Sequence, residues 1–171
     1  MISKKNLVVL DFDGVCTSTL PDGGSYLNNP PSKYHWSKDC IDNLQQLLTR
    51  ASAEVVISTN WRRFKEGEGW MYHGQKYINP LPELLRILDG KVAGMLPKDR
   101  GLRKSEALIL WLEGFKHVPN FVIFDDDLRE GFQDTFDYGI YKKFILTNPQ
   151  LGLTAQNINK AMEILEKQNY V

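Results

Sequence analysis

The chain has 171 residues, of which 42% are hydrophobic and 25% charged, the size and composition of one globular domain with a substantial core. Its 21 basic and 21 acidic residues cancel, so the overall charge creates no field that favours nucleic acid or a membrane surface. Cys16 and Cys40 are too few for a disulfide scaffold or a zinc site, and they predict a reducing, cytoplasmic compartment. No apolar segment is long enough to predict a membrane span.

The first predicted element is a buried strand over residues 7–10, where four apolar residues follow one another. Asp11 and Asp13 come at its carboxyl end, where open α/β sheets hold their ligands, and a period of two directs both side chains the same way. Two carboxylates at such a short distance repel each other unless a cation lies between them. The pattern indicates a divalent metal site, a nucleophile and acid pair, or both, with Gly14 letting the backbone leave the strand.

The middle of the chain alternates turn-rich and periodic segments. Residues 18–36 are rich in proline, glycine and asparagine and predict a loop or small flap. Ser37 is typical of an N-cap and precedes a predicted helix over Lys38–Arg50. Residues 54–57 predict a second buried strand, which ends in Ser58 and Thr59, and residues 61–80 predict an irregular insert.

The second half continues the alternation of helices and strands. It predicts helices over residues 81–88, 103–112 and 155–167, and strands over residues 92–96, 121–124 and 143–147. The strand over 121–124 is strongly apolar and runs directly into Asp125, Asp126 and Asp127.

Strands that alternate with helices predict a parallel sheet covered on both faces, a three-layer Rossmann-like α/β fold over residues 1–171 as one domain. Right-handed crossovers bring the carboxyl ends of such strands to one edge. The residues gathered there are Asp11, Asp13, Ser58, Thr59 and Asp125–Asp127. Polar residues therefore follow three separate apolar runs and are expected to meet at one place.

Four stretches resemble, in order, the motifs of the haloacid dehalogenase (HAD) superfamily, which consists mostly of Mg²⁺-dependent phosphatases. They are the segment from Asp11 to Thr17, the strand end with Ser58, Thr59 and Asn60, the lysine Lys104 at a helix start, and the acidic run after Phe124. The resemblance implies a HAD-type fold with a minimal cap or none, because neither insert is long enough for a separate cap domain.

The resemblance also implies a role for each matching residue. Asp11 is the expected nucleophile, and Asp13 is the expected acid and base. Mg²⁺ is expected on Asp11, Asp13, Asp125 and Asp126, with Asp13 contributing its backbone carbonyl and Asp127 only orienting or capping. The expected phosphoryl-binding hydroxyl is that of Thr59, with Ser58 as the alternative, and Asn60 and Arg62 join Ser58 in substrate binding. Lys104, with Lys98 as its competitor, is expected to offset the charge on the phosphoryl oxygens.

A narrower resemblance, to small HAD domains linked to RNA-repair proteins, is carried by Val-Ile-Ser-Thr-Asn-Trp-Arg, Lys-x-x-Ala-x-x-x-Trp-Leu and Gly152-Leu153-Thr154. An open site implies a large phosphorylated substrate such as a nucleic-acid end. The insert is basic and carries Trp61, Trp70 and Tyr72, which predicts contact with a phosphate backbone and a stacked base, or else a solvated face over core aromatics. The alternatives are a small-molecule phosphatase or nucleotidase under the flap, and a HAD fold used only as an interaction module.

Overall fold

A five-stranded parallel sheet forms the centre of the computed structural model, which describes residues 5–17, 36–65, 67–72, 75–99 and 101–168. The strands lie in the order β5-β2-β1-β6-β7. Their bounds are β1 (Asn6–Leu10), β2 (Ala53–Ile57), β5 (Val92–Met95), β6 (Asn120–Asp125) and β7 (Phe144–Leu146). Leu10 pairs with Ile57 on one side and with Phe124 on the other, so the three central strands end level with one another.

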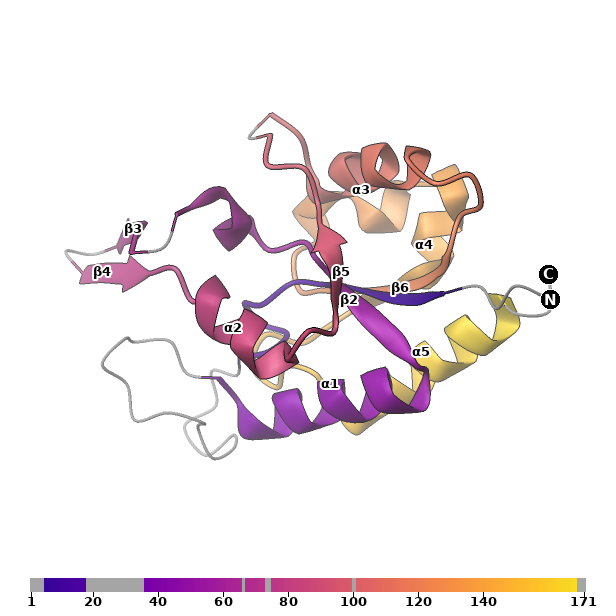
Figure 1. The fold of residues 1–171 in the computed structure, drawn as a ribbon, viewed down its shortest axis with the longest axis horizontal. Coiled ribbons are helices and arrows are strands. Elements are labelled where there is room, and N and C mark those ends of the chain that lie inside the picture. Colours follow the sequence, from indigo (N-terminus) through magenta and orange to yellow (C-terminus); the bar gives the residue numbers. More distant parts are fainter. Residues whose placement is uncertain (1–4, 18–35, 66, 73–74, 100, 169–171) are drawn as a thin grey trace.

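Helices cover both faces of this sheet, as the alternation of elements predicts (Figure 1). They are α1 (Lys38–Arg50), α2 (Leu81–Leu88), α3 (Lys104–Glu113), α4 (Ile140–Lys143) and α5 (Ala155–Gln168). Buried side chains of α1, α2 and α5 belong to one apolar cluster, whereas those of α3 and α4 belong to the other. The predicted three-layer Rossmann-like α/β fold is confirmed.

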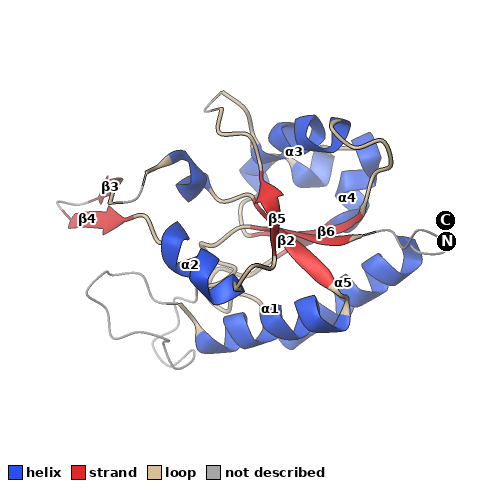
Figure 2. Ribbon diagram, in the orientation of Figure 1, coloured by secondary structure: helices blue, strands red, loops and turns tan. Residues whose placement is uncertain are grey.

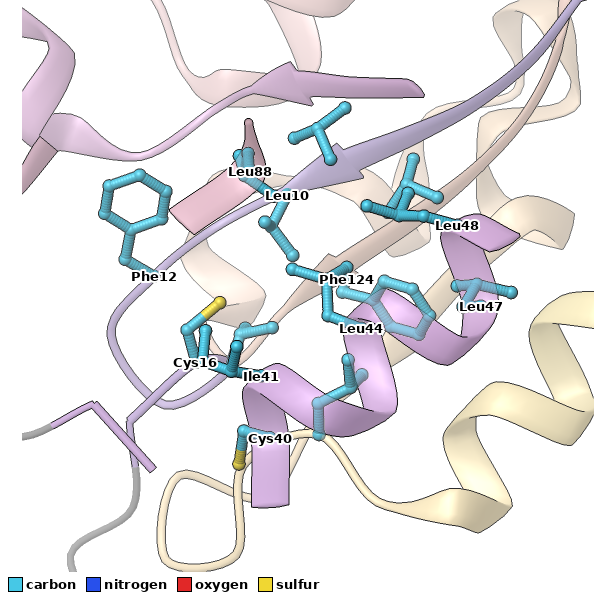
Figure 3. Packing of buried hydrophobic residues seen from close by; sticks show 14 of the residues in the cluster. Leu10, Phe12, Cys16, Cys40, Ile41, Leu44, Leu47, Leu48, Leu88 and Phe124 are labelled. Atoms are coloured by element: carbon cyan, nitrogen blue, oxygen red, sulfur yellow. The ribbon is translucent and has the colours of Figure 1, made fainter. Parts of the chain in front are cut away.

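Successive side chains of β1 alternate between the two apolar clusters, one on each face of the sheet. Val8 and Leu10 join the cluster under α1 and α5, while Leu7 and Val9 join the cluster under α3. Figure 3 shows Leu10 and Phe124 from the sheet directed toward Leu44 on α1. A strand buried on both faces reads as a continuous apolar run, which explains the composition of β1.

Local signals set the ends of two helices at the predicted residues. The Ser37 side chain accepts a hydrogen bond from the backbone N–H of Cys40 and so caps the start of α1. Asp89 and Gly90 follow α2 with φ of 42° and 75°, a left-handed turn that ends the helix.

The insert is more regular than the sequence predicts. It begins with a short 3₁₀ helix, η1 (Asn60–Arg63), and continues into an antiparallel hairpin of β3 (Gly69–Tyr72) and β4 (Gln75–Ile78). Figure 2 shows this hairpin apart from the five-stranded sheet. The expectation of an irregular segment over 61–80 was wrong because four cross-strand pairs order a stretch that has no apolar alternation.

Most of the predicted flap, residues 18–35, lies outside the described residues. Its last residue, Trp36, is buried and bridges to Thr17, and its ring lies edge-on to Phe12 at 5.7 Å between ring centroids. Three further 3₁₀ turns follow β6, namely η2 (Leu128–Glu130), η3 (Phe132–Asp134) and η4 (Asp137–Gly139). Within the described parts of the chain, the helices lack the combined length and apolar character that crossing a membrane requires.

Gly152 ties the loop after β7 to the turn after β1. Its φ is 64°, and a Cβ built there would lie 2.5 Å from Cys40 Sγ and 2.8 Å from the carbonyl oxygen of Thr17. The next residue, Leu153, donates its backbone N–H to the carbonyl of Val15 at 2.8 Å. Only glycine fits this position without moving the backbone that follows the first strand.

We predict that Gly152→Ala lowers the free energy of unfolding by about 2–4 kcal/mol, because it adds a steric overlap to a left-handed backbone. Gly90→Ala is the matched control, since Gly90 also has positive φ but an added Cβ would meet nothing within 4 Å. That variant is expected to lose only about 1 kcal/mol. Urea unfolding measures both, and equal losses would contradict the close packing at Gly152.

Candidate active site

Asp11 and Asp13 follow β1 as predicted, but their surroundings differ. Asp11 is 4% exposed and its backbone N–H donates to the carbonyl of Phe124, whereas Asp13 is exposed at the surface of the site. Asp11 Oδ1 is buried and has no hydrogen-bond partner among the described residues. A buried carboxylate oxygen without a donor has a coordination position left for a cation or an incoming group.

Lys104 lies between two of the acidic residues. Its Nζ is 2.7 Å from Asp11 Oδ2 and 2.7 Å from Asp125 Oδ2, and all three side chains are buried. Burial lowers the pKa of Lys104, but the charges of Asp11 and Asp125 outweigh burial and raise it. The ammonium group is therefore charged, whereas the sequence competitor Lys98 is exposed.

The three acidic residues at the end of β6 differ in their contacts. Asp125 Oδ1 accepts the backbone N–H of Asp127, and Oδ2 accepts from Lys104, so both of its oxygens are engaged. Asp126 is half-buried beside them. Asp127 accepts the backbone N–H of Arg129 and caps η2, so the expectation that it only orients or caps is consistent with its contacts.

The acids also differ in their protonation. Burial and the charge of Asp11 raise the pKa of Asp125, but the hydrogen-bonded ammonium at 2.7 Å opposes this, and we assign Asp125 as ionised. Burial, and next the charge of Asp11, raise the pKa of Asp126 to about 6. The same two causes raise the pKa of Asp13 to about 7, while the Trp61 hydrogen bond opposes them. Because Asp13 reaches solvent, water screens part of the effect.

The arrangement fits a divalent cation. Asp11, Asp125 and Asp126 each offer a carboxylate oxygen, and these oxygens lie within 4.8 Å of one another. The free Asp11 Oδ1 and the half-buried Asp126 leave oxygen ligands for a hard cation such as Mg²⁺. Gly14 adds space, because a Cβ built there would overlap the Asp126 carboxylate, and its φ is 64°. Thr147 holds this turn by donating Oγ1–H to the Gly14 carbonyl at 2.9 Å.

Two hydroxyl groups end β2, both fully buried. Ser58 Oγ has no partner among the described residues, whereas Thr59 Oγ1 accepts the backbone N–H of Trp61 and caps η1. Both hydroxyls therefore keep a proton to donate toward a ligand at the strand end.

Arg62 lies beneath the site and not on its surface. Its Nη1 donates to the carbonyls of Ser58 and Thr59 at 2.7 and 2.8 Å, and its Nε donates to the carbonyl of Pro97 at 3.2 Å. Burial, together with Arg63, lowers the pKa of Arg62 to about 10, so the guanidinium remains charged at neutral pH. Arg62 was expected to bind substrate; its Nη1 and Nε hold the loop after β2, and its buried Nη2 has no hydrogen-bond partner among the described residues.

Glu130 connects three motifs, although no sequence pattern indicates this role. Its carboxylate accepts from Asn60 Nδ2 at 3.2 Å and from the backbone N–H of Lys104 at 2.9 Å. The second contact satisfies a donor at the start of α3, where the helix itself supplies no acceptor. Asn60, expected to bind substrate, is thus held by Glu130. The Leu-Arg-Glu-Gly stretch has only the pattern of a solvated turn.

For Trp61 the sequence left two alternatives open, stacking on a base or packing in the core, and the side chain is 4% exposed, which fits the core alternative. Its Nε1–H donates to Asp13 Oδ2 at 3.0 Å, and its ring packs against Phe64 at 5.7 Å between centroids. Sequence pattern alone does not separate an aromatic side chain that faces solvent from one that turns back under a strand end. The other two aromatics of the insert, Trp70 and Tyr72, lie in β3.

The first acidic pair lies at the end of the central strand β1, and the acidic run lies at the end of the neighbouring strand β6. This order of groups along the chain is that of the haloacid dehalogenase class. A family model described as the HAD domain in Swiss Army Knife RNA repair proteins matches residues 7–158, and the chain belongs to this family. Searches of curated proteins and of solved structures gave no match. Membership indicates a phosphatase-type hydrolase.

We predict that Glu130→Ala lowers the free energy of unfolding by about 1–3 kcal/mol, because two donors lose their acceptor. Glu113→Ala is the control, since Glu113 is an exposed residue at the other end of α3. Denaturant unfolding compares the two variants. A loss no larger in Glu130→Ala than in Glu113→Ala would show that the carboxylate does not hold these segments together.

Proposed function

We propose that the chain is a Mg²⁺-dependent phosphoric monoester hydrolase that forms an aspartyl-phosphate on Asp11. The observation that carries the proposal is Lys104 Nζ at 2.7 Å from both Asp11 and Asp125, next to a buried Asp11 oxygen that has no partner among the described residues. A carboxylate used as a nucleophile needs a neighbouring cation to bring a negatively charged phosphoryl group close.

In the first step, Asp11 forms a bond to phosphorus while the bond from phosphorus to the leaving oxygen breaks. Asp13 donates its proton to that oxygen, and its raised pKa supports a protonated carboxyl near neutral pH. The backbone and hydroxyl groups at Ser58 and Thr59 are available to hold the phosphoryl oxygens. Lys104 offsets part of the charge that gathers there.

In the second step, a water attacks phosphorus and the bond to Asp11 breaks. Asp13, now ionised, takes the proton of that water, so the carboxylates return to their starting states and inorganic phosphate leaves. Asp11, Asp125 and Asp126, with the backbone carbonyl of Asp13, are the groups that would hold Mg²⁺. Bound Mg²⁺ neutralises negative charge on the phosphoryl group and fixes its position.

The test is a phosphatase screen with added Mg²⁺ or with a chelator. The substrates are aryl phosphates, mononucleotides, and oligonucleotides phosphorylated at the 3′ or the 5′ end. Hydrolysis that depends on Mg²⁺ supports the proposal, and no hydrolysis of any phosphoester would contradict it.

We predict that Asp11→Asn abolishes turnover, because an amide neither attacks phosphorus nor binds Mg²⁺ well. Asp13→Asn keeps the nucleophile but lacks the base for the second step. With an activated aryl phosphate it is expected to become phosphorylated and then stall. Mass spectrometry of the quenched protein should find the phosphoryl group on the peptide that contains Asp11, and an adduct elsewhere would contradict the assignment.

We further propose that the substrate is a large one with an exposed phosphate, such as a nucleic-acid end. Two observations support this proposal. The family description names RNA repair proteins, and Lys65 and Lys98 are exposed on segments that adjoin η1. Pro97 accepts from Arg62 and Asp99 accepts from Arg63, so the loop with Lys98 packs against η1.

We predict that the double variant Lys65→Ala/Lys98→Ala loses about tenfold in kcat/KM for a phosphorylated oligonucleotide, because each exposed lysine near the strand contributes attraction that salt screens. Turnover of an aryl phosphate should stay unchanged. Lys160→Ala/Lys167→Ala on α5 removes the same charge from another element and serves as the control. Equal losses on both substrates would favour a small-molecule phosphatase.

A further inference from the structure

We infer that Trp61 is a positioning residue for the general acid, because its indole N–H fixes the Asp13 carboxyl group with one oxygen left for the leaving group. This inference rests on the proposed hydrolase reaction. The contact is a hydrogen bond from Nε1–H of Trp61 to Oδ2 of Asp13 at 3.0 Å. Within the part of the chain that the structure describes, this indole is the group that donates to the Asp13 side chain.

The indole is held firmly enough to impose an orientation. Trp61 is 4% exposed and belongs to the apolar cluster that includes α1 and β1. Its backbone N–H donates to Thr59 Oγ1 at 3.4 Å, and its carbonyl accepts from Phe64 at 3.0 Å. Ring and backbone are therefore both fixed, and a packed side chain places its polar atom more accurately than an exposed one does.

The chemistry of the indole makes the contact directional. An indole nitrogen donates a hydrogen bond but cannot accept one, so Oδ2 of Asp13 must be the accepting oxygen. When the carboxyl group is protonated, its proton then belongs on Oδ1, which is the oxygen not held by Trp61. Trp61 thus selects which oxygen can pass a proton to a leaving group.

This role also explains why a large aromatic residue follows the second strand. Asp13 is exposed, and an exposed carboxyl group rotates freely unless a partner fixes it. The donor comes from η1, directly after Ser58 and Thr59, so the group that fixes the acid and the groups expected to bind phosphate move as one segment. Phosphoryl group and proton donor are then placed relative to each other by one short stretch of chain.

Trp61→Phe tests the inference, because phenylalanine keeps an aromatic ring but has no N–H. General acid catalysis matters most for a leaving group of high pKa and least for an activated aryl group. We expect Trp61→Phe to phosphorylate Asp11 at the wild-type rate in a single turnover of 2,4-dinitrophenyl phosphate, and on the order of tenfold to a hundredfold more slowly in a single turnover of an alkyl phosphate. Trp111→Phe, at a partly buried tryptophan on α3 that packs on Phe115, is the matched control.

A double-mutant cycle separates positioning from a structural effect. In an Asp13→Asn background, which is still expected to become phosphorylated, Trp61→Phe should change the rate of Asp11 phosphorylation little, because the acid is already absent. A uniform loss over all leaving groups, or the same loss in both backgrounds, would overturn the inference and leave Trp61 as a packing residue.

A spectroscopic measurement tests the contact without any activity. The Trp61 indole N–H resonance, assigned from its disappearance in Trp61→Phe, should shift upfield and exchange faster in Asp13→Asn than in wild type. The Trp111 resonance should not respond. An unchanged Trp61 signal would refute the hydrogen bond, whereas a responsive signal in a protein that hydrolyses no phosphoester would count against the proposed function alone.

Discussion

The contact between the Lys104 ammonium group and two carboxylates determines how the acidic residues can coexist at the sheet edge. Asp11 and Asp125 lie side by side because Leu10 pairs with Phe124 in neighbouring parallel strands. Both are buried, and two buried like charges are costly without a cation between them. Lys104 Nζ lies 2.7 Å from each. The lysine can reach this position only if α3 begins where it does, and Glu130 holds that start by accepting the backbone N–H of Lys104.

Donors from three different segments make the carboxylates unequal. Lys104 Nζ donates a hydrogen bond to Asp11 Oδ2, and Trp61 Nε1–H donates one to Asp13 Oδ2. The backbone N–H of Asp127 donates to Asp125 Oδ1. Asp11 and Asp13 each keep an oxygen that these donors leave open, whereas Asp125 has both oxygens engaged. Residues that composition treats as equivalent therefore differ in their hydrogen-bond partners, and each partner comes from a separate segment of the chain.

Sequence patterns predicted the framework well, because burial repeats with the period of a strand or helix. The apolar run before Asp11, the Ser37 cap and the Asp89-Gly90 stop each gave an element whose position the structure confirms. The same patterns did not indicate the contacts of Trp61, Arg62 and Glu130. Each of these residues has a hydrogen-bond partner 48, 35 or 70 positions away in the chain. The spacing of apolar residues within one strand or helix does not indicate such a long-range contact.

Charge balance at the sheet edge follows from the same contacts. Lys104 pairs with carboxylates, whereas Nη1 and Nε of Arg62 donate to the uncharged carbonyls of Ser58, Thr59 and Pro97, so its positive charge acts on the acidic residues from a distance. Asp11, Asp13, Asp125, Asp126 and Glu130 supply five carboxyl groups against the two cations Lys104 and Arg62. The Asp11 oxygen that has no hydrogen-bond partner among the described residues lies beside these carboxyl groups, where bound positive charge would reduce their mutual repulsion.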